Sequence, residues 1–544
     1  MDTARDTVTD EVTDTGTYEV ADEVTEPDVI VVGAGPTGLM LGCELALAGV
    51  QVRIVERRAE ATQNSRALTL HPRSLELMDM RGLASRFLSS GRTVPGWHYA
   101  NLPTRLDFSA LDSRHGHTLF LAQARTEALL EERARELGVR IDRGHEVLGL
   151  TQDDTGVSVD LRDSDGQAVT CRARYVVGCD GGRSVVRQAA TIGFSGTDET
   201  LTGVLGDFAV TDASPEVLDA ARANGVLAVP LEAGLTRFVY IDPERMRTPA
   251  AEPVTLEEFR SSLSRICGHD CGVAEPRWLS RFGNTTRLAD RYRSGRVLVA
   301  GDAAHIHFPA AGQGLNTGLQ DAMNLGWKLA AVVNGWAPAG LLDSYEDERR
   351  PVGQAVTQDT EVQLLLAELA LVPQYQRPGT ALRTLFDELL GIQEVNRLLA
   401  GRVSALSTAY ASPLEGTHPL VGRRMPDIGL STADAENTRV YELLAAGHFV
   451  LIDLVGHNLA GHNGERAQST QPVEGWAARL TVANAANPAA HEDRDELRGV
   501  SEILVRPDGH IAWATQAVDA DVRRAERVQA LTAWAGRPTE VTPV

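Results

Sequence analysis

A glycine-rich turn between an apolar run and a helical stretch constrains the fold of this chain more than any other feature. The run Asp28–Val32 is rich in β-branched residues, as expected of a buried parallel strand, and it leads directly into the turn Gly33–Gly38. Helical sequence follows to Ala48, and a second apolar run, Gln51–Val55, ends in Glu56. Strand, turn, helix, strand and acid in this order predict a doubly wound α/β unit that binds a nucleotide.

The residues of this turn have distinct physical roles in binding phosphate. Gly33 permits a tight turn, Gly35 lets the backbone approach a pyrophosphate, and Gly38 lets the helix pack closely against the sheet. The start of the helix supplies free N–H groups and a partial positive charge. The predicted phosphate site therefore comprises Gly33, Gly35, Pro36, Thr37 and Gly38.

The acid at the end of the second strand indicates which nucleotide the site accepts. Glu56 lies 18 residues beyond Gly38, where a carboxylate accepts hydrogen bonds from the hydroxyl groups of a ribose. It would repel a 2′-phosphate, so the site suits FAD or NAD and not NADP. Arg57, the next residue, is included in the predicted site.

A second glycine-rich segment lies far along the chain and indicates that one long cofactor is held at both ends. Gly301–His305 follows the buried apolar run Arg296–Ala300, and the segment continues through Pro309 and Gly312–Asn316. Asp302 would lie at the carboxyl end of a strand, where ligands bind in open α/β sheets. Two such segments favour a flavin dinucleotide over simple nicotinamide binding.

Three further patterns belong to the same region of the predicted fold. The apolar run Tyr175–Cys179 ends in Asp180-Gly181, a pair that taken alone is most often only a turn. The helical period of Gly318–Val333 would aim the start of a helix at the cofactor. His305 and His307 have no third ligand at suitable spacing, so we expect no metal site.

The composition excludes several classes of protein. A formal net charge of −22 argues against nucleic-acid binding, because a phosphate backbone would be repelled. No run approaches the roughly 20 apolar residues of a membrane span, and the five cysteines are too scattered for a disulfide scaffold. Residues 1–27 alternate acidic residues with Thr and Val, which predicts a disordered tail and not a signal peptide. We therefore expect a cytoplasmic enzyme, and 544 residues predict two or three domains.

The pattern changes to short alternating strands over residues 195–290. Phe208–Val210, Thr236–Tyr240 and Trp278–Phe282 are typical of antiparallel strands, and together they predict a sheet that covers a substrate. Aromatic residues on strands are core residues more often than ligand contacts. The candidates for a pocket, which we do not assign as catalytic, are Arg237, Tyr240, Trp278 and Phe282.

With these residues in view, the chain resembles the group A flavoprotein monooxygenases of the para-hydroxybenzoate hydroxylase fold over residues 28–395. The resemblance implies that Glu56 binds the adenosine ribose and that Asp302 binds the ribityl or ribose region of FAD. Asp180-Gly181 would serve both FAD and the nicotinamide cofactor. It also implies FAD contacts by Arg66 and Gln123, by Pro309, and by the backbone amides of the run that contains Gly312, Gly314, Leu315 and Asn316. This chain departs from its relatives in having Phe308-Pro309 and Ala311-Gly312, where they often have Pro-Pro and Gly-Gly.

The end of the chain, residues 412–544, is similar to the thioredoxin-like C-terminal domain of phenol hydroxylase and of the aromatic-polyketide hydroxylases of actinobacteria. No cysteine follows Cys271, so this domain cannot carry out thiol redox chemistry. The fold class implied is α/β, with a Rossmann-like FAD-binding domain, an inserted and mainly antiparallel β substrate domain, and the thioredoxin-like domain. The expected boundaries are 28–97, 123–190 and 283–395 for the FAD-binding domain, 98–122 and 191–282 for the substrate domain, and 412–544 for the last domain.

The resemblance also implies an activity. NAD(P)H, as NADPH or NADH, would reduce FAD, and a flavin C4a-hydroperoxide formed with O2 would hydroxylate a multi-ring aromatic polyketide in antibiotic biosynthesis. A Baeyer–Villiger oxygenase on the same scaffold is the alternative, because fold alone does not separate the two outcomes. A halogenase is disfavoured because the chain has no Trp-x-Trp motif, and a flavin-binding scaffold without turnover is disfavoured because the cofactor loops are intact. The residues name no catalytic base, and a monomer and a homodimer are both compatible with them.

Overall fold

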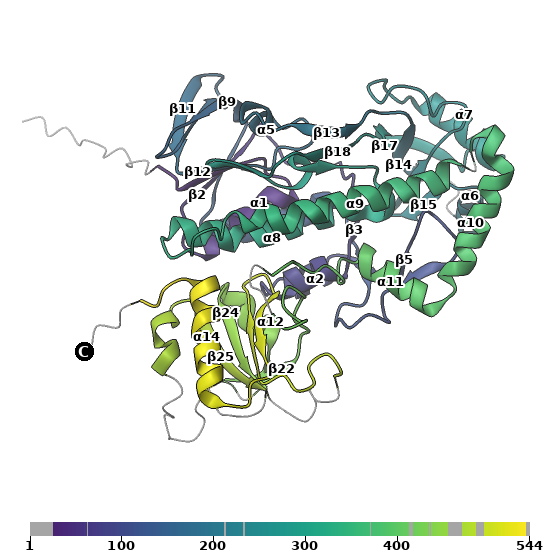
Figure 1. The fold of residues 1–544 in the computed structure, drawn as a ribbon. Helices are drawn as coiled ribbons and strands as arrows, with labels where there is room; N and C mark the ends of the chain where they lie inside the picture. The colour runs from purple at the N-terminus through teal and green to yellow at the C-terminus, as the bar shows by residue number, and fades with distance from the viewer. Residues whose placement is uncertain are drawn as a thin grey trace, which may run out of the picture.

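The structure is a computed structural model that describes residues 26–539 with the exception of 63, 211–213, 232–233, 370, 413–416, 433–434, 436, 455–470 and 486–493. The predicted disordered tail, residues 1–27, lies outside the described residues except for its last two positions. Helices α8 (Gln313–Val333) and α9 (Ser344–Glu368) cross the middle of the molecule (Figure 1). The strands at 175–178, 202–210 and 273–283 lie on one side of these helices, and the C-terminal domain lies on the other.

The central sheet has the parallel arrangement that the first glycine turn predicts. Its strand order is β19-β20-β12-β1-β2-β8, and every pair is parallel except β19 with β20. The register places Val32, at the end of β1, beside Gly178 of β12 and Val55 of β2, so the turns after these strands leave the sheet together. The strands are β1 (Val29–Val32), β2 (Val52–Glu56), β8 (Arg140–Arg143), β12 (Tyr175–Gly178), β19 (Arg293–Ser294) and β20 (Val297–Val299).

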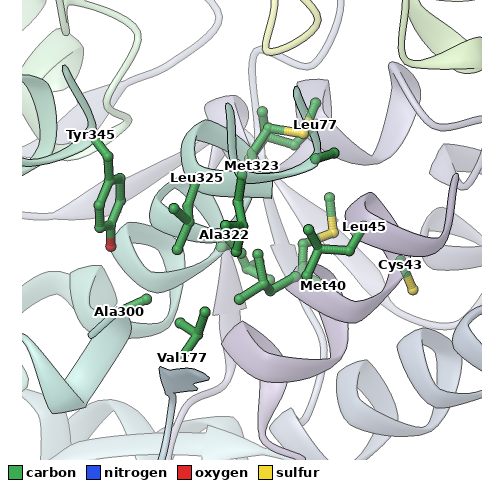
Figure 2. Close-up of a cluster of buried hydrophobic side chains, with 14 of the residues drawn as sticks. Met40, Cys43, Leu45, Leu77, Val177, Ala300, Ala322, Met323, Leu325 and Tyr345 are labelled. Atoms are coloured by element: carbon green, nitrogen blue, oxygen red, sulfur yellow. The ribbon is translucent and has the colours of Figure 1, made fainter. Parts of the chain in front are cut away.

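Apolar helices pack against this sheet and form the core of the molecule. Figure 2 shows Met40 and Leu45 of α1 (Pro36–Leu47) gathered with Ala322, Met323 and Leu325 of α8. All five side chains are buried, and they belong to one continuous cluster that includes the strands of the central sheet. The other helices of this region are α2 (Pro72–Asp79), α3 (Ala84–Leu88), α4 (Gln123–Glu136) and α5 (Val185–Ala189).

Helix α8 begins at Gln313 and not at Gly318, where the periodicity placed its start. Gly314, Leu315 and Asn316 therefore lie in the first turn of a helix and not in a loop that precedes it. Glycine and asparagine have low helix propensity, but tertiary packing overrides propensity here. Asn316 and Thr317, for example, are both buried.

A four-stranded antiparallel sheet of order β15-β16-β14-β17 contains the three strands predicted between residues 195 and 290. Phe208, Phe238 and Tyr240 are buried on one of its faces with Phe259 of α7, and α6 packs there too. The elements are β14 (Thr202–Val210), β15 (Leu227–Pro230), β16 (Leu235–Tyr240), β17 (Val273–Gly283), α6 (Pro215–Ala223) and α7 (Leu256–Cys267).

Residues 98–122 contribute to two smaller sheets. Strand β5 (Gly96–His98) pairs with β6 (Arg105–Asp107), and β7 (Thr118–Phe120) pairs with β3 (Thr69–Leu70) and β4 (Arg92–Val94). In the part of the chain that the structure describes, this segment pairs with none of the four strands above. Its assignment to a substrate domain, like the other domain boundaries, stays a proposal.

The remaining elements of the first 411 residues complete the surface of the molecule. One three-stranded sheet has the order β11-β10-β9, and another has the order β13-β18-β21. Their strands are β9 (Glu146–Gln152), β10 (Val157–Arg162), β11 (Ala168–Ala173), β13 (Phe194–Thr197), β18 (Thr286–Ala289) and β21 (His305–Ile306). Helices α10 (Gln376–Leu390) and α11 (Gln393–Val403) follow α9.

The C-terminal domain is a second α/β unit built on a sheet of order β23-β22-β25-β24-β26-β27. Strands β24 and β25 are parallel, and the other pairs are antiparallel. Helix α14 (Ala520–Ala535) packs Leu531 and Trp534 into a cluster that also contains Trp327 of α8, so the core of this domain continues into the rest of the molecule. The other elements are β22 (Gly429–Ser431), β23 (Thr438–Arg439), β24 (Phe449–Asp453), β25 (Leu480–Ala485), β26 (Glu502–Val505), β27 (Ile511–Thr515) and α12 (Val440–Leu443). Among the described residues, no helix is long and apolar enough to cross a membrane.

Candidate active site

Three turns that are distant in sequence meet at the carboxyl edge of the central sheet. A Cβ added at Gly33 would overlap the carbonyl oxygen of Cys179 and lie 3.2 Å from the Cα of Asp180. A Cβ added at Gly301 would lie 2.6 Å from Oγ1 of Thr37, and one at Gly318 would overlap the same oxygen. The turn after β1 thus contacts both the Asp180 turn and the Gly301 turn, as expected if one cofactor spans them.

The geometry of the first turn fits a bound pyrophosphate. A Cβ at Gly38 would overlap the carbonyl oxygen of Gly33, whereas a Cβ at Gly35 meets no atom of the described residues within 4 Å. Gly38 is therefore needed for packing, and Gly35 leaves open space in front of the backbone. No side chain caps the start of α1, and no acidic residue lies in its first turn, so the positive end of the helix faces this space without competition.

Glu56 is held so that its carboxylate faces the same turn. One oxygen accepts a hydrogen bond from the backbone N–H of Ala34 at 2.9 Å, and the other accepts from the N–H and Nε of Arg58 at 2.9 and 3.0 Å. Burial opposes ionisation, but the hydrogen bonds from Arg58 and Ala34 outweigh it and hold the pKa of Glu56 below its usual value. A fixed, charged acceptor at this point suits a ribose hydroxyl.

Asp180 has one paired and one unpaired carboxylate oxygen. Oδ2 accepts from the backbone N–H groups of Val185 and Val186 at 2.7 and 3.2 Å, whereas Oδ1 is buried and has no partner among the described atoms. Burial raises the pKa of Asp180 above its usual value. A buried acceptor without a donor is costly, and a bound group that donates a hydrogen bond would relieve that cost.

The start of α8 is built in a different way, because residues from another part of the chain hold it. Its first residue is preceded by Ala311 and Gly312, which have φ angles of 51° and 69°. Nε2 of His71 lies 2.7 Å from the carbonyl oxygen of Ala311, and the His71 N–H donates to Oδ1 of Asn316 at 2.8 Å. Asn316 in turn donates to the carbonyl oxygen of Thr69 at 3.0 Å. No side chain caps this helix start, so its free N–H groups can face an electron-rich ring.

The protonation state of His71 follows from these contacts. Burial lowers its pKa to about 4, against a weaker opposing effect of the hydrogen bond to Ala311, so the ring is neutral near pH 7. Because the carbonyl of Ala311 can only accept, Nε2 carries the proton and Nδ1 accepts from the hydroxyl of Thr118 at 3.2 Å. A neutral histidine therefore fixes the left-handed peptide that precedes α8.

The other predicted site residues occupy distinct positions around these turns. Asp302 is exposed in the first turn after β20, and Pro309 and Arg57 are exposed too. Gln123 accepts from the N–H of Ala67 at 3.2 Å and donates to Glu127 at 2.8 Å, so it holds the segment next to Arg66. Arg66 is exposed. The half-buried members of the set are Gly35, Pro36, Thr37, Gln123, Asp180, Gly181, Gly312, Gly314 and Leu315.

One face of the four-stranded sheet approaches this site. Arg237 is buried in a bidentate pair with Asp207, at 2.6 and 2.7 Å, and its third nitrogen donates to the carbonyl oxygen of Arg66 at 3.0 Å. Its guanidinium group also lies 5.6 Å from the ring of Trp278. The face that carries Arg237 and Trp278 is therefore turned toward the cofactor segment.

The remaining pocket candidates divide between the two faces. Tyr240 lies in the core on the opposite face, where its hydroxyl donates to the carbonyl oxygen of Phe259 at 3.1 Å. The ring of Phe282 lies 5.8 Å from that of Phe308, which precedes α8. Trp278 and Phe282 thus remain candidates for substrate contact, whereas Tyr240 is a core residue.

His71, Asp321 and Arg349 contact the predicted motifs but were not predicted as site residues. Asp321 accepts from the N–H of Gly301 at 3.0 Å and from Nε of Arg349 at 2.7 Å. Asp321 had one detectable signal, because an acid within the apolar stretch of α8 must be paired if it is buried. His71 had none, since a lone histidine before a proline matches no motif. No group of three or more metal-ligating side chains is present in the described part of the chain, and His305 instead pairs with Asp321 at 2.7 Å.

The fold and the converging turns define a protein with a site for an extended dinucleotide, and comparisons with known proteins identify the family. Residues 26–360 match the FAD binding domain family, and residues 418–538 match the C-terminal domain of aromatic-ring hydroxylases. The chain belongs to the FAD-dependent aromatic monooxygenases that combine these two domains. The predicted family, the α/β fold class and the monooxygenase class are confirmed.

Three similar proteins illustrate the relationship. An uncharacterized aromatic compound monooxygenase, YhjG of Bacillus subtilis, is 45% identical over 91% of this chain and 95% of its own length. A rifampicin monooxygenase of Streptomyces venezuelae is 43% identical over 94% of this chain and 99% of its own length. The solved structure of the anhydrotetracycline hydroxylase OxyS from Streptomyces rimosus superposes with a TM-score of 0.80 at 40% identity, over 94% of this chain and all of that chain.

Proposed function

We propose that this protein is a FAD-dependent monooxygenase that consumes NAD(P)H and inserts one oxygen atom from O2 into a multi-ring aromatic polyketide, in the biosynthesis of an antibiotic or a related metabolite. The observation that carries the proposal is the meeting of the two glycine-rich turns at Thr37. Only an extended cofactor would use both turns, and FAD is the cofactor of the family. The substrate class is supported by relatives that are named for rifampicin and anhydrotetracycline.

The FAD contacts that we propose follow from the geometry above. The start of α1 would hold the pyrophosphate and Glu56 the adenosine ribose. The start of α8 would face the flavin ring, and Asp302 lies beside it. The full proposed set is Gly33, Gly35, Pro36, Thr37, Gly38, Glu56, Arg57, Arg66, Gln123, Asp180, Gly181, Asp302, Pro309, Gly312, Gly314, Leu315 and Asn316.

The bound flavin would supply the redox chemistry and the activated oxygen, and the protein must orient the substrate and exclude water. The sheet face that carries Arg237 and Trp278 is suited to this second task. Because Arg237 is bonded both to Asp207 and to the backbone of Arg66, this face is fixed relative to the cofactor segment. A planar multi-ring substrate would pack between this face and the start of α8.

The test is a panel of polyketide phenols added to the FAD-loaded protein, with flavin reduction by NADPH and by NADH followed by stopped flow. We expect a true substrate to accelerate reduction by a factor of about 100 or more, and the product to gain one oxygen atom. NMR of the product then separates hydroxylation from Baeyer–Villiger ring cleavage, since both add the same mass. If every compound leaves the reduction rate unchanged and no oxygenated product forms, the polyketide assignment is wrong.

A matched pair of variants tests the proposed substrate face. Trp278→Leu alters the face turned toward the cofactor, and Phe259→Leu alters the core on the other side of the same sheet. We expect Trp278→Leu to raise the KM for the polyketide about tenfold, with little change in substrate-free flavin reduction. Phe259→Leu should lower thermal stability and leave the KM unchanged. Equal KM values for the two variants would remove Trp278 from the pocket.

A further inference from the structure

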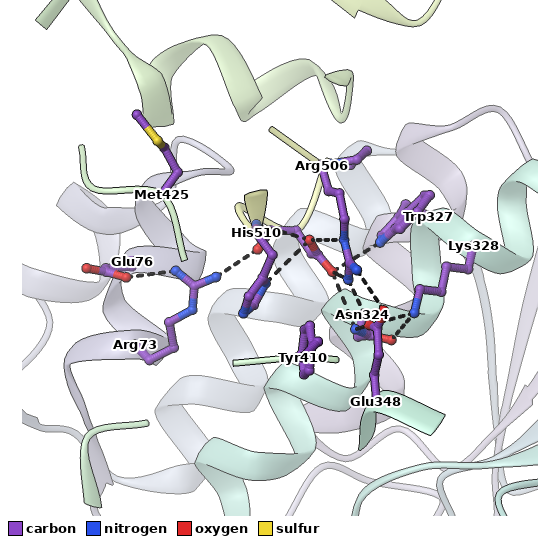
Figure 3. A network of polar contacts seen from close by, with 12 residues as sticks. Arg73, Glu76, Asn324, Trp327, Lys328, Glu348, Tyr410, Met425, Arg506 and His510 are labelled. Carbon is purple, nitrogen blue, oxygen red and sulfur yellow. Dashed lines mark hydrogen bonds and ion pairs between the residues drawn. The ribbon is translucent and has the colours of Figure 1, made fainter. Parts of the chain in front are cut away.

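The C-terminal domain inserts a charged turn between the two long helices of the FAD-binding region. Arg506 forms a bidentate ion pair with Glu348 of α9, at 2.7 and 2.8 Å, and Asp508 accepts from Trp327 of α8 at 3.3 Å. Arg506 also pairs with Asp508. Figure 3 shows Arg506, Glu348 and Lys328 drawn together at this point, with Tyr410 beside them. All of these side chains are buried, so the contacts are not weakened by water.

Tyr410 lies between Arg506 in this turn and Arg349 of α9. The guanidinium group of Arg506 is 5.3 Å from the centre of the Tyr410 ring, and the ring of His510 is 4.4 Å from it. The Tyr410 hydroxyl accepts a hydrogen bond from a terminal nitrogen of Arg349 at 3.1 Å. Tyr410 therefore packs on the C-terminal domain through its ring and contacts α9 through its hydroxyl.

Arg349 continues the chain of contacts to the turn after β20. Its Nε donates to Oδ1 of Asp321 at 2.7 Å, and another nitrogen donates to the carbonyl oxygen of Thr317 at 3.2 Å. Oδ2 of Asp321 accepts from the backbone N–H of Gly301 at 3.0 Å and lies 2.7 Å from Nε2 of His305. Arg349 and Asp321 are fully buried, so the charge of each side chain is stabilised by the opposite charge of the other.

We propose that the C-terminal domain is a positioning element of the FAD site, and that Tyr410, Arg349 and Asp321 are the positioning residues through which it holds the Gly301–His305 turn. None of the three needs to touch the cofactor. The contacts act on the backbone N–H of Gly301, next to Asp302, and on α8 through the carbonyl oxygen of Thr317, its fifth residue. This inference rests on the proposed placement of the flavin beside these two segments.

Electrostatics explains why the contact would affect position and not only stability. Burial opposes ionisation of Asp321, but Arg349 and His305 together hold its pKa below the usual value, so it stays charged. A carboxylate that must satisfy Arg349, His305 and Gly301 at once has one orientation that serves all three. Removing the hydrogen bond from Arg349 to Tyr410 leaves a guanidinium N–H without an acceptor, and Arg349 would then shift and move Asp321 with it.

The experiment measures FAD affinity in full-length variants that remove one contact each, at increasing distance from the Gly301 turn. They are Asp321→Asn, which contacts the turn directly, Tyr410→Phe, which lies between the turn and the C-terminal domain, and Arg506→Lys in the C-terminal domain itself. The control is Tyr441→Phe, because Tyr441 is also buried and its hydroxyl donates a hydrogen bond to the carbonyl oxygen of Met425 and not to a group that contacts Arg349. FAD is removed, the dissociation constant is measured by flavin fluorescence on reconstitution, and the melting temperature of each apoprotein is recorded.

We expect the FAD dissociation constant to rise about 20-fold in Asp321→Asn, about 5-fold in Tyr410→Phe and about 2-fold in Arg506→Lys, because each hydrogen bond to a charged group transmits only part of its strength. Tyr441→Phe should bind FAD as the wild type does. The melting temperatures should follow a different order, with Arg506→Lys among the least stable because it weakens a buried ion pair. Bound flavin in Tyr410→Phe should also show a shifted absorption spectrum.

Two results would overturn the proposal. One is equal FAD affinity in Tyr410→Phe and Tyr441→Phe, and the other is a loss of affinity that simply follows the loss of melting temperature. If Asp321→Asn does not fold, the comparison of the two tyrosine variants still decides the question. FAD affinity is measured without substrate, so the result is independent of whether a polyketide is the substrate.

Discussion

The two ends of the proposed FAD site are built in opposite ways. At the phosphate end, strand, turn, helix and acid lie within residues 28–56, and the link from Glu56 to Ala34 spans only 22 positions. At the flavin end, the segment 301–316 is held by Thr37 of α1 and by His71, which lies 240 positions before the Ala311 carbonyl that it contacts. The first end is specified by a local stretch of sequence, whereas the second depends on tertiary contacts.

The backbone conformations also differ at one position. Gly33 at the phosphate end and Gly301 and Gly312 at the flavin end have positive φ as glycines, whereas Ala311 has positive φ and a side chain that disfavours this region by about 1–2 kcal/mol. Such a conformation persists only where the surroundings impose it. The hydrogen bond from His71 to the carbonyl oxygen of Ala311 is the contact that does so. Changes at the phosphate end should therefore act through packing, and changes at the flavin end through remote partners.

The largest effect is expected at the phosphate end, from Gly38→Ala. The added methyl would overlap the carbonyl oxygen of Gly33, and neither backbone can move without disturbing the sheet. We expect the free energy of unfolding of the apoprotein to fall by about 3 kcal/mol, as measured by urea denaturation. An apoprotein as stable as the wild type would show that the turn is not packed as described.

Gly35→Ala is the matched control for that variant, because its methyl would meet no atom within 4 Å in the part of the protein that the structure describes. Apoprotein stability should change by no more than about 0.5 kcal/mol. The FAD dissociation constant should nevertheless rise by a factor of about ten or more, since the methyl enters the space proposed for the pyrophosphate. Unchanged FAD affinity would place the pyrophosphate elsewhere.

The second prediction concerns the flavin end and pH. The ordinary pKa of histidine is 6.5, and burial lowers the pKa of His71 to about 4 in the folded protein. Below pH 6.5 the unfolded chain therefore takes up a proton that the folded protein does not, and stability falls as the pH decreases toward 4. Over that whole range the loss from this one group is about 3 kcal/mol.

His71→Gln removes this titration and keeps a side-chain donor for the carbonyl of Ala311. The difference in unfolding free energy between variant and wild type at pH 7 measures the altered contacts. The change in that difference between pH 7 and pH 5 measures how much the protonation of His71 in the unfolded chain contributes. Over this range the unfolding free energy of the wild type should fall by about 2 kcal/mol more than that of the variant. A difference that does not depend on pH would mean that His71 is not buried and neutral as described.

The sequence predicted the fold of the proposed phosphate end because its determinants lie close together in the chain. Gly38 packs on Gly33 and Glu56 bonds to Ala34 within one β-α-β unit, so a close approach and an acid at the end of a strand could be assigned from spacing alone. The parallel sheet and the three antiparallel strands of the other region followed from the same kind of local pattern.

The flavin end was predicted only in outline. The glycines and Asn316 were assigned to the site, but α8 was expected to begin at Gly318, because propensity does not report the tertiary contacts that fix Asn316. His71 and Arg349 reach the site from elements whose position depends on the whole fold. No spacing in one sequence reveals that Tyr410, after α11, contacts a helix that lies far before it.

The third prediction returns to the phosphate end, where Glu56→Gln replaces an acceptor-only group by one that also donates. The amide would turn its NH2 group toward the N–H of either Ala34 or Arg58, so one hydrogen bond is lost. We expect a loss of about 1–2 kcal/mol in unfolding free energy at pH 7 and an FAD dissociation constant about ten times higher.

The pH dependence of this variant has a definite sign. Because the pKa of Glu56 lies below 4.5 in the folded protein, the carboxylate contributes stability above pH 4.5, and that contribution is lost as the pH falls through the folded-state value. Wild type and Glu56→Gln should therefore become more alike in acid. A stability gap that widens in acid would contradict the hydrogen bonds assigned to the carboxylate.

The smallest effect is expected from Ala311→Gly, at the non-glycine residue with positive φ that precedes α8. Glycine relieves the positive φ of 51°, but the variant also loses a buried methyl and gains freedom in the unfolded chain. These effects are each about 1 kcal/mol and oppose one another, so we expect a net change below about 1 kcal/mol in urea denaturation. FAD affinity should change less than about twofold, because His71 holds the carbonyl of residue 311 and not its side chain.

Ala311→Val is the contrasting variant, since a β-branched residue at this φ is strained and should cost at least about 2 kcal/mol. If glycine weakened FAD binding as much as valine does, the methyl of Ala311 would itself determine the conformation at the flavin end. The hydrogen bond from His71 to the carbonyl of residue 311 would then not be enough to maintain that conformation.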